Sequence, residues 1–371
     1  MNLNIYQSNG YADIESILNY KYNGMICPFV FIYGPRGSGK TFNTLWFAYK
    51  NNLKFLYLRR KKIQADIARQ PEAQPFKKIN DVFGSKITTK PINQYLAGFY
   101  TYTEAGPDLK NPEVDLDASR TDDKEIIISN KCVGYISSVS TFHNLRSVDF
   151  SDVDIIIYDE FIPEPTEHTE DGEADAVFNC YETVSRNREL DGGNPLRLVC
   201  LANSNRLSNP IFLSLDLINN VENMRKNGYT YRVIPDRGVL LIDMKNSPIS
   251  ELKSHTALYK LTAGSNYYNM AINNDFAYDN MSNISSVDIK NYSALVCIGP
   301  ITIYKSKSNT NLFYVSRHKS GSPLILSESN KDIDFFRRRF GFLWDQYTFN
   351  RIMFEEYTCE VYFCKYFKRL K

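Results

Sequence analysis

The sequence is poor in the features that mark secreted, metal-bound, disordered or membrane-spanning proteins. Its seven cysteines form no CxxC pair and its four histidines have no ligand spacing, which argues against a disulfide framework and a zinc site. Eighteen glycines and fifteen prolines are too few for long disordered stretches. The longest apolar stretch, Met25 to Tyr33, is far shorter than the roughly 20 residues of a membrane-spanning helix. Because the N-terminal MNLNIYQSNG also lacks signal-peptide character, we expect a soluble protein of a reducing cytoplasm.

The chain also lacks the net charge that would indicate a polyanionic partner, because its formal charge is only +2. Charge is nevertheless uneven along the sequence. Eight carboxylates and no Lys or Arg lie between Asp159 and Asp175, whereas five cations and no acid lie between Lys54 and Lys62. The basic run could face DNA, a neighbouring subunit or only water, and a solvated face is the commonest explanation of such a run.

The pattern of apolar segments predicts the fold class. A length of 371 residues, at roughly 150 residues per domain, indicates two domains. Met25 to Tyr33 is short, continuous and rich in aromatic and β-branched residues, which predicts a buried strand, and a glycine-rich loop and the helical pattern of Thr41 to Lys50 follow it. The alternation continues, which predicts the α/β class with a mostly parallel central sheet flanked by helices. The further elements expected are strands at Leu53–Leu58, Asp154–Tyr158 and Leu196–Ala202 and a helix at Asp175–Arg188.

Other parts of the sequence have weaker patterns. Five prolines between residues 70 and 123 indicate an irregular or inserted segment, and residues 125–138 have the pattern of a hairpin. After about residue 217, short strand candidates replace the earlier alternation. We therefore expect a first domain at residues 1–210, a linker at 211–228 and a smaller C-terminal α/β or α+β domain at 229–371.

The strongest motif is a full match to GxxxxGK[ST] between the first expected strand and helix. It consists of Gly34, Pro35, Arg36, Gly37, Ser38, Gly39, Lys40 and Thr41. In such a loop the glycines let backbone amides turn toward phosphates, the lysine reaches the outer phosphates and the hydroxyl binds Mg²⁺. The loop predicts an ATP site in which Lys40 contacts the phosphates and Thr41 contacts the metal.

The second half of such a site should be an apolar strand that ends in an acid. The segment IIIYDE supplies it, with Asp159 as the metal ligand and Glu160 as the general base that polarises the attacking water. A glutamate directly after the metal-binding aspartate is typical of motor ATPases, whose nucleophile is water. Strand ends are also commonly acidic for solubility alone, so the pair depends on the upstream loop for its meaning.

Three further residues are candidates for the parts that a motor needs. Arg186 or Arg188, in the segment SRNRE, would neutralise charge on the γ-phosphate in the neighbouring subunit of a ring. Asn203, at the tip of the strand Leu196–Ala202, would sense the γ-phosphate. The alternatives are two solvated arginines at a helix end and an asparagine that merely ends a strand.

These segments together resemble the DNA-encapsidation ATPases of phi29-like tailed bacteriophages. The resemblance covers about the first 215 residues and rests on GPRGSGKT, YLRRK, GYISSVSTFHNLRSVDFSDVDIIIYDEF, SRNRE and LANSNRLSNPIF. It implies an additional-strand, catalytic-glutamate ATPase domain in a ring, expected to be a pentamer, that drives double-stranded DNA into a preformed capsid from the host cytoplasm. It also implies a portal partner, in some relatives a structural packaging RNA, and a C-terminal domain like a ribonuclease H-type nuclease that has lost its activity. In that domain Asp243 is a lone acid.

Two other functions are compatible with the motifs. One is a large terminase with a working nuclease, which metal-dependent DNA cutting would reveal. The other is a host-type P-loop ATPase with no part in packaging, which an absence of DNA-stimulated ATP turnover would favour.

Overall fold

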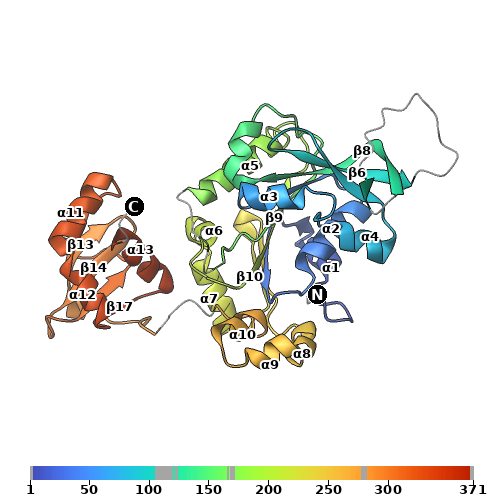
Figure 1. The fold of residues 1–371 in the computed structure, drawn as a ribbon. Coiled ribbons are helices and arrows are strands. Elements are labelled where there is room, and N and C mark those ends of the chain that lie inside the picture. The colour runs from blue at the N-terminus through green and yellow to red at the C-terminus, as the bar shows by residue number, and fades with distance from the viewer. Residues whose placement is uncertain are drawn as a thin grey trace. The chain divides into compact units, whose positions relative to one another are not determined.

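The chain folds into two compact units, each with its own sheet and core (Figure 1). The computed structural model describes residues 3–104, 120–121, 124–164, 167, 172–276 and 282–367. The first unit comprises Met1–Ile211 and Met224–Ala277, and the second comprises Phe212–Asn223 and Tyr278–Lys371. None of the helices in the described ranges has both the length and the apolar character that crossing a membrane requires.

The first unit is built on a mixed sheet whose described strands number ten, in the order β11-β12-β3-β10-β9-β4-β8-β6-β5, with β7 paired to β8. Neighbouring strands from β12 to β8 all pair in parallel, whereas β5, β6, β7 and β11 pair antiparallel. The strands are β3 (Phe29–Gly34), β4 (Phe55–Arg59), β5 (Ile87–Pro91), β6 (Ala97–Glu104), β7 (Arg120–Thr121), β8 (Lys124–Ser138), β9 (Ile155–Asp159), β10 (Arg197–Asn203), β11 (Tyr231–Ile234) and β12 (Val239–Asp243).

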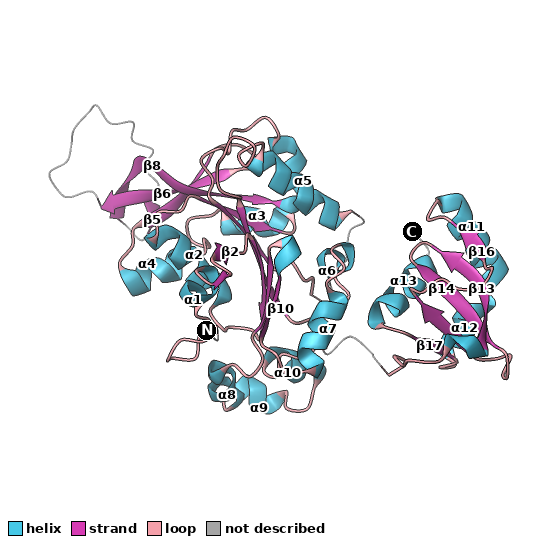
Figure 2. Ribbon diagram, turned by 180° about the vertical axis from the view of Figure 1, so that it is seen from behind, coloured by secondary structure: helices cyan, strands magenta, loops and turns pink. Residues whose placement is uncertain are grey.

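Helices cover both faces of this sheet, which is why its central strands are continuous apolar runs. Val30 and Ile32 of β3 pack on one face with Leu45 of α2, while the ring of Phe29 on the other face lies 5.3 Å from that of Tyr181 in α5. Accordingly, α1 and α2 lie on one side of β10 and α5 on the other (Figure 2). The helices up to residue 271, of which α6 and α7 overlap the segment Phe212–Asn223 of the second unit, are α1 (Ile14–Leu18), α2 (Lys40–Lys50), α3 (Lys62–Ala68), α4 (Lys77–Phe83), η1 (Val139–Leu145), α5 (Glu173–Ser185), α6 (Pro210–Ser214), α7 (Ile218–Lys226), η2 (Pro235–Arg237), α8 (Pro248–Ser254), α9 (Ala257–Leu261) and α10 (Asn266–Ala271).

Three local expectations differ from the structure. The expected strand Met25–Tyr33 is divided: β2 (Met25–Ile26) forms a hairpin with β1 (Lys21–Tyr22), and β3 begins only after Pro28, which has no amide hydrogen for a ladder. The proline-rich segment expected to be irregular contains the helix α4 and the strands β5 and β6, which extend the sheet, although its residues 105–119 and 122–123 lie outside the described ranges. The expected hairpin at 125–138 is the single long strand β8.

The second unit contains a five-stranded mixed sheet within its described residues, in the order β16-β13-β14-β15-β17. The strands β13, β14 and β15 form an antiparallel meander. β16 pairs in parallel with β13, and β17 pairs in parallel with β15. Phe336 of α11 and Phe363 of α13 pack into its core with Ile303. The elements are η3 (Ile289–Asn291), β13 (Tyr292–Ile298), β14 (Ile301–Ser306), β15 (Phe313–Ser316), β16 (Leu324–Leu326), α11 (Asn330–Phe340), α12 (Phe342–Thr348), β17 (Ile352–Phe354) and α13 (Tyr357–Phe367).

The division between the units differs from the expected boundary after residue 228. Val239–Asp243 is buried along its whole length and pairs in parallel with β3, so it belongs to the first sheet. Burial on both faces is what its apolar sequence VLLI requires. The change in sequence texture after residue 217 therefore falls within the short segment Phe212–Asn223 of the second unit, after which the chain returns to the first unit until Ala277.

Candidate active site

The parallel strands bring most of the candidate residues to one edge of the first sheet. Parallel strands end at the same edge, and ligands of open α/β sheets bind there. The loop after β3, the acids at the end of β9 and Asn203 at the end of β10 meet at this edge, and Asn203 is paired in register with Gly34. The edge also receives Arg59 from the end of β4, which the sequence reasoning did not single out.

The phosphate-loop backbone has the conformation that its glycines allow. Gly37 and Gly39 have φ values of +67° and +81°, and α2 begins at Lys40 directly after them. Gly34 lies so close to Met244 that an added Cβ would stand 2.6 Å from the Met244 Cβ. The N-terminal segment supports the loop from outside, because the amide of Ala12 donates to the carbonyl of Ser38 at 2.9 Å.

The side chain of Lys40 points into the loop and is only 7% exposed. Its Nζ donates to the Pro35 carbonyl at 2.8 Å and to the Gly34 carbonyl at 3.1 Å. It also contacts the Asn203 Oδ1 at 3.4 Å, which ties the loop to the end of β10. Burial lowers the pKa of Lys40 to about 7; Asp159 opposes this shift, whereas Lys253 and Arg36 add to it. An anion in the loop would stabilise the charged form of this buried amine.

Asp159 and Thr41 form a set of oxygen ligands beside the loop. The Thr41 hydroxyl donates to the two carboxylate oxygens of Asp159 at 3.0 and 3.1 Å, and the Tyr57 hydroxyl donates to Oδ2 at 2.8 Å. A hydroxyl and a carboxylate next to a phosphate loop are the hard oxygen ligands that Mg²⁺ prefers. The residues present therefore fit a Mg²⁺ site shared with phosphate oxygens.

Glu160 follows Asp159 in a left-handed conformation, with a φ of +58°, which turns its side chain away from the strand direction. Arg59 holds both acids: its guanidinium is 2.5 Å from the Glu160 Oε2 and 3.1 Å from the Asp159 Oδ2. Burial raises the pKa of Glu160 above its ordinary value, and Arg59 lowers it again in part. Arg59 thus positions the carboxylate of Glu160 next to that of Asp159.

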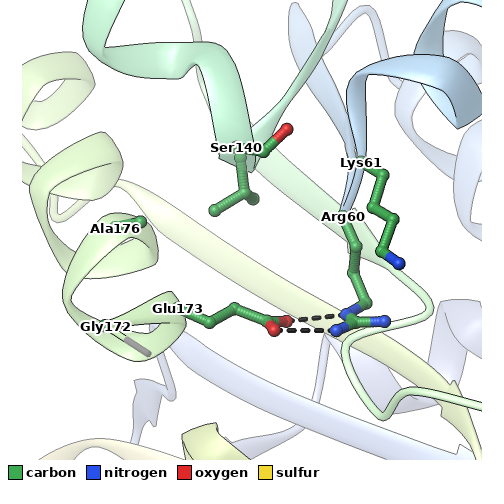
Figure 3. A pocket seen from close by; sticks show the side chains of 7 residues that line it. Arg60, Lys61, Ser140, Gly172, Glu173 and Ala176 are labelled. Atoms are coloured by element: carbon green, nitrogen blue, oxygen red, sulfur yellow. Dashed lines mark hydrogen bonds and ion pairs between the residues drawn. The ribbon is translucent and has the colours of Figure 1, made fainter. Parts of the chain in front are cut away.

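The basic run Lys54–Lys62 is not a uniformly solvated face, which corrects the commoner expectation for it. Arg59 contacts the acids at the sheet edge, and Arg60 is buried in a bidentate pair with Glu173 at 2.7 and 2.8 Å (Figure 3). Arg60 also contacts Glu167 at 2.6 Å. Residues from the acidic stretch are therefore counterions for the basic run, and the Arg60–Glu173 pair lies beside a cavity of about 100 Å³.

Arg186 and Arg188 lie apart from the residues gathered at the sheet edge. Arg186 follows α5 with a φ of +49°, is 49% exposed at its side chain and pairs with Asp149 at 3.5 Å. Arg188 donates to the Val184 carbonyl at 3.5 Å. In the part of the chain that the structure describes, neither has a contact with Lys40 or Glu160, so a role for either in its own subunit has no geometric support.

Asp243 is also in a different place from the one the sequence suggested. It ends β12 in the first unit, and not in a nuclease-like C-terminal domain. Its carboxylate accepts hydrogen bonds from Arg225 Nε at 2.8 Å and from the side-chain amide of Asn274. It is the buried partner of an arginine.

Comparisons with known proteins find similarity to the DNA packaging proteins of bacteriophages. A family model described as "Podovirus DNA encapsidation protein (Gp16)" matches residues 108–321. The DNA packaging protein of Bacillus phage B103 is 26% identical over 255 residues, which cover 67% of this chain and 64% of that protein. The corresponding protein of Bacillus phage phi29 is 30% identical over 158 residues, covering 42% of this chain and 43% of that one. The matched part is thus less than two thirds of the length of these relatives.

Two solved structures have a similar fold over nearly the whole chain. One, described as the bacteriophage Phi-29 viral genome packaging motor assembly, has a TM-score of 0.61 at 17% identity and covers 96% of this chain and 99% of its own. The other, described as the Phi-28 gp11 DNA packaging motor, has a TM-score of 0.57 at 19% identity and covers 93% of this chain and 95% of its own. At these identities the likeness is one of fold.

Proposed function

Because the chain belongs to the podovirus DNA encapsidation protein family, we propose that it is an ATP-hydrolysing motor that drives double-stranded viral DNA into a preformed capsid. The observation that carries this proposal is the meeting of Lys40, Thr41, Asp159 and Glu160 at one edge of a parallel sheet. The names of its relatives, which are DNA packaging proteins, support the packaging role.

Each residue of the site has a role that its contacts support. The loop amides and Lys40 would bind the phosphates of ATP, and Thr41 and Asp159 would hold Mg²⁺, which supplies positive charge against the phosphate oxygens. Glu160 would accept a proton from the attacking water, and Arg59 would set the position of its carboxylate. Asn203, which already contacts Lys40, would register whether the γ-phosphate is present.

The strand order supports assignment of the first unit to the additional-strand, catalytic-glutamate ATPases. β10 lies between the loop strand β3 and the acid strand β9, which is the additional strand that gives this class of ATPases its name. Assembly as a pentameric ring on the portal of a capsid, with Arg186 or Arg188 reaching the neighbouring site, is part of the same proposal. The second unit would be an inactive, ribonuclease H-like domain that contacts DNA or the portal.

The test is ATP turnover by the full chain with double-stranded DNA and portal-bearing capsids. Lys40→Ala should lose ATP binding, whereas Glu160→Gln should bind ATP but hydrolyse it about 10²- to 10⁴-fold more slowly, the usual contribution of a positioned base. Glu72→Gln, which changes an exposed glutamate in the same way, is the matched control. Normal turnover by Glu160→Gln, or no stimulation of the wild type by DNA and capsids, would contradict the proposal.

A further inference from the structure

A second lysine reaches the phosphate loop from a part of the sequence far from the loop. Lys253 lies in α8, and its ammonium donates to the carbonyl of Arg36. The same Nζ would stand 3.1 Å from a Cβ added at Gly37. Lys253 therefore contacts the loop at residues 36 and 37, whereas Lys40 contacts it at residues 34 and 35.

The position of α8 is set by close contacts with the N-terminal segment that also supports the loop. The Ser247 hydroxyl donates to the Gly10 carbonyl at 3.3 Å, and a Cβ at Gly10 would lie 2.8 Å from the backbone nitrogen of Ile249. Gly10 has a φ of +84°, so a side chain there would be strained as well as crowded. Two residues later, Ala12 bonds to the loop at Ser38. The loop, the N-terminal turn and α8 are thus joined within one unit.

The ammonium of Lys253 lies near an aromatic ring. It lies 5.0 Å from the centre of the Tyr259 ring, and that ring stacks on Tyr267 at 6.3 Å. Among the described residues no carboxylate pairs with Lys253. Burial lowers the pKa of Lys253, and the nearby Arg36 adds to this effect. A partly buried cation without a counterion is unfavourable, and an anion in the loop would relieve it.

We infer that Lys253 binds the outer phosphates of the nucleotide, as a second lysine beside Lys40. The amides of a phosphate loop surround the β- and γ-phosphates, so a cation over residues 36 and 37 is within reach of the γ-phosphate once it exchanges the Arg36 carbonyl for phosphate oxygen. This inference rests on ATP being the ligand of the loop. It makes the helices α8 to α10 sensitive to the γ-phosphate, because Lys253 and Tyr259 belong to them.

The test compares a non-hydrolysable ATP analogue with ADP by calorimetric titration of the full chain. Lys253→Met keeps most of the alkyl stem but removes the charge, and it should weaken binding of the analogue by about tenfold or more, as expected for loss of a charge-assisted hydrogen bond. Binding of ADP, which lacks the γ-phosphate, should change much less, and Lys253→Arg should restore most of the loss. Lys260→Met, on exposed α9 surface, is the matched control.

Equal losses for both nucleotides would show a structural role only and would overturn the inference, as would unchanged binding of the analogue. If the wild type bound neither nucleotide, or if Lys40→Ala bound as well as the wild type, the proposed function itself would fail. A measurement on unaltered protein covers the case in which Lys253→Met does not fold. Acetylation of Lys253, followed by mass spectrometry, should be slowed by the analogue more than by ADP, with Lys260 unaffected; equal labelling of Lys253 in all states would overturn the inference.

Discussion

Replacing Asp243 by alanine should destabilise the first unit strongly, because the change leaves a partly buried arginine without its counterion. Asp243 is 1% exposed and accepts from Arg225 Nε at 2.8 Å. Breaking a buried ion pair by removing one partner costs about 3–5 kcal/mol. Arg225 is 16% exposed at its side chain and keeps the Asn274 carbonyl at 2.6 Å and the Phe276 ring at 4.0 Å. We therefore expect a loss near the lower end, about 3 kcal/mol.

The assay is urea unfolding monitored by a probe that reports on the first unit alone. The chain has two tryptophans, and Trp46 lies in α2 with its ring stacked on Phe83 at 4.0 Å. A Trp344→Phe background leaves Trp46 as the only tryptophan, so its fluorescence follows unfolding of the sheet that contains Asp243. Because the chain has two units, a signal from both would not give a two-state free energy.

A double-mutant cycle separates the ion pair from simple loss of packing. Asp243→Ala combined with Arg225→Met removes both charges and should cost at least about 1 kcal/mol less than the sum of the two single changes. Asp236→Ala, an exposed acid in the η2 turn, should change stability by less than about 0.5 kcal/mol. Additive losses in the cycle, or a loss below 1 kcal/mol (about the average for any point mutation) for Asp243→Ala, would refute this reasoning.

Two predictions concern parts of the proposal that lie outside the sheet edge. If Arg186 or Arg188 acts on the neighbouring site, mixing its alanine variant with wild-type subunits should lower ATP turnover more than in proportion to the fraction of variant subunits. The alanine variant of the other arginine should lower ATP turnover only in proportion to that fraction. A proportional decline for both variants would exclude both arginines. The second unit should not cut DNA, so supercoiled plasmid incubated with the protein and Mg²⁺ or Mn²⁺ should stay intact, and its conversion to nicked or linear forms would favour a terminase with a working nuclease.

The sequence was informative where chemistry is carried by contiguous residues. GPRGSGKT begins where a strand ends, and IIIYDE contains a strand and the acids at its end, so the class of the fold and the position of both motifs at a sheet edge could be predicted. The order of α and β segments similarly predicted a mostly parallel sheet. By contrast, proline content was a poor guide to residues 70–104, because β5 pairs with β6, and β6 pairs with β8, which comes later in the chain.

The sequence by itself determined the local frame of this protein: which segments are buried strands, where the phosphate loop turns and where two acids follow a strand. Only the tertiary structure decided which cations accompany those groups. Arg59 contacts Glu160 across 101 residues of sequence, and Lys253 contacts Arg36 across 217. The physical reason is that local propensity and residue spacing act over only a few residues. Charged side chains that are far apart in the sequence can pair only after folding has brought the parallel strands, and the elements that follow them, to a common edge of the sheet.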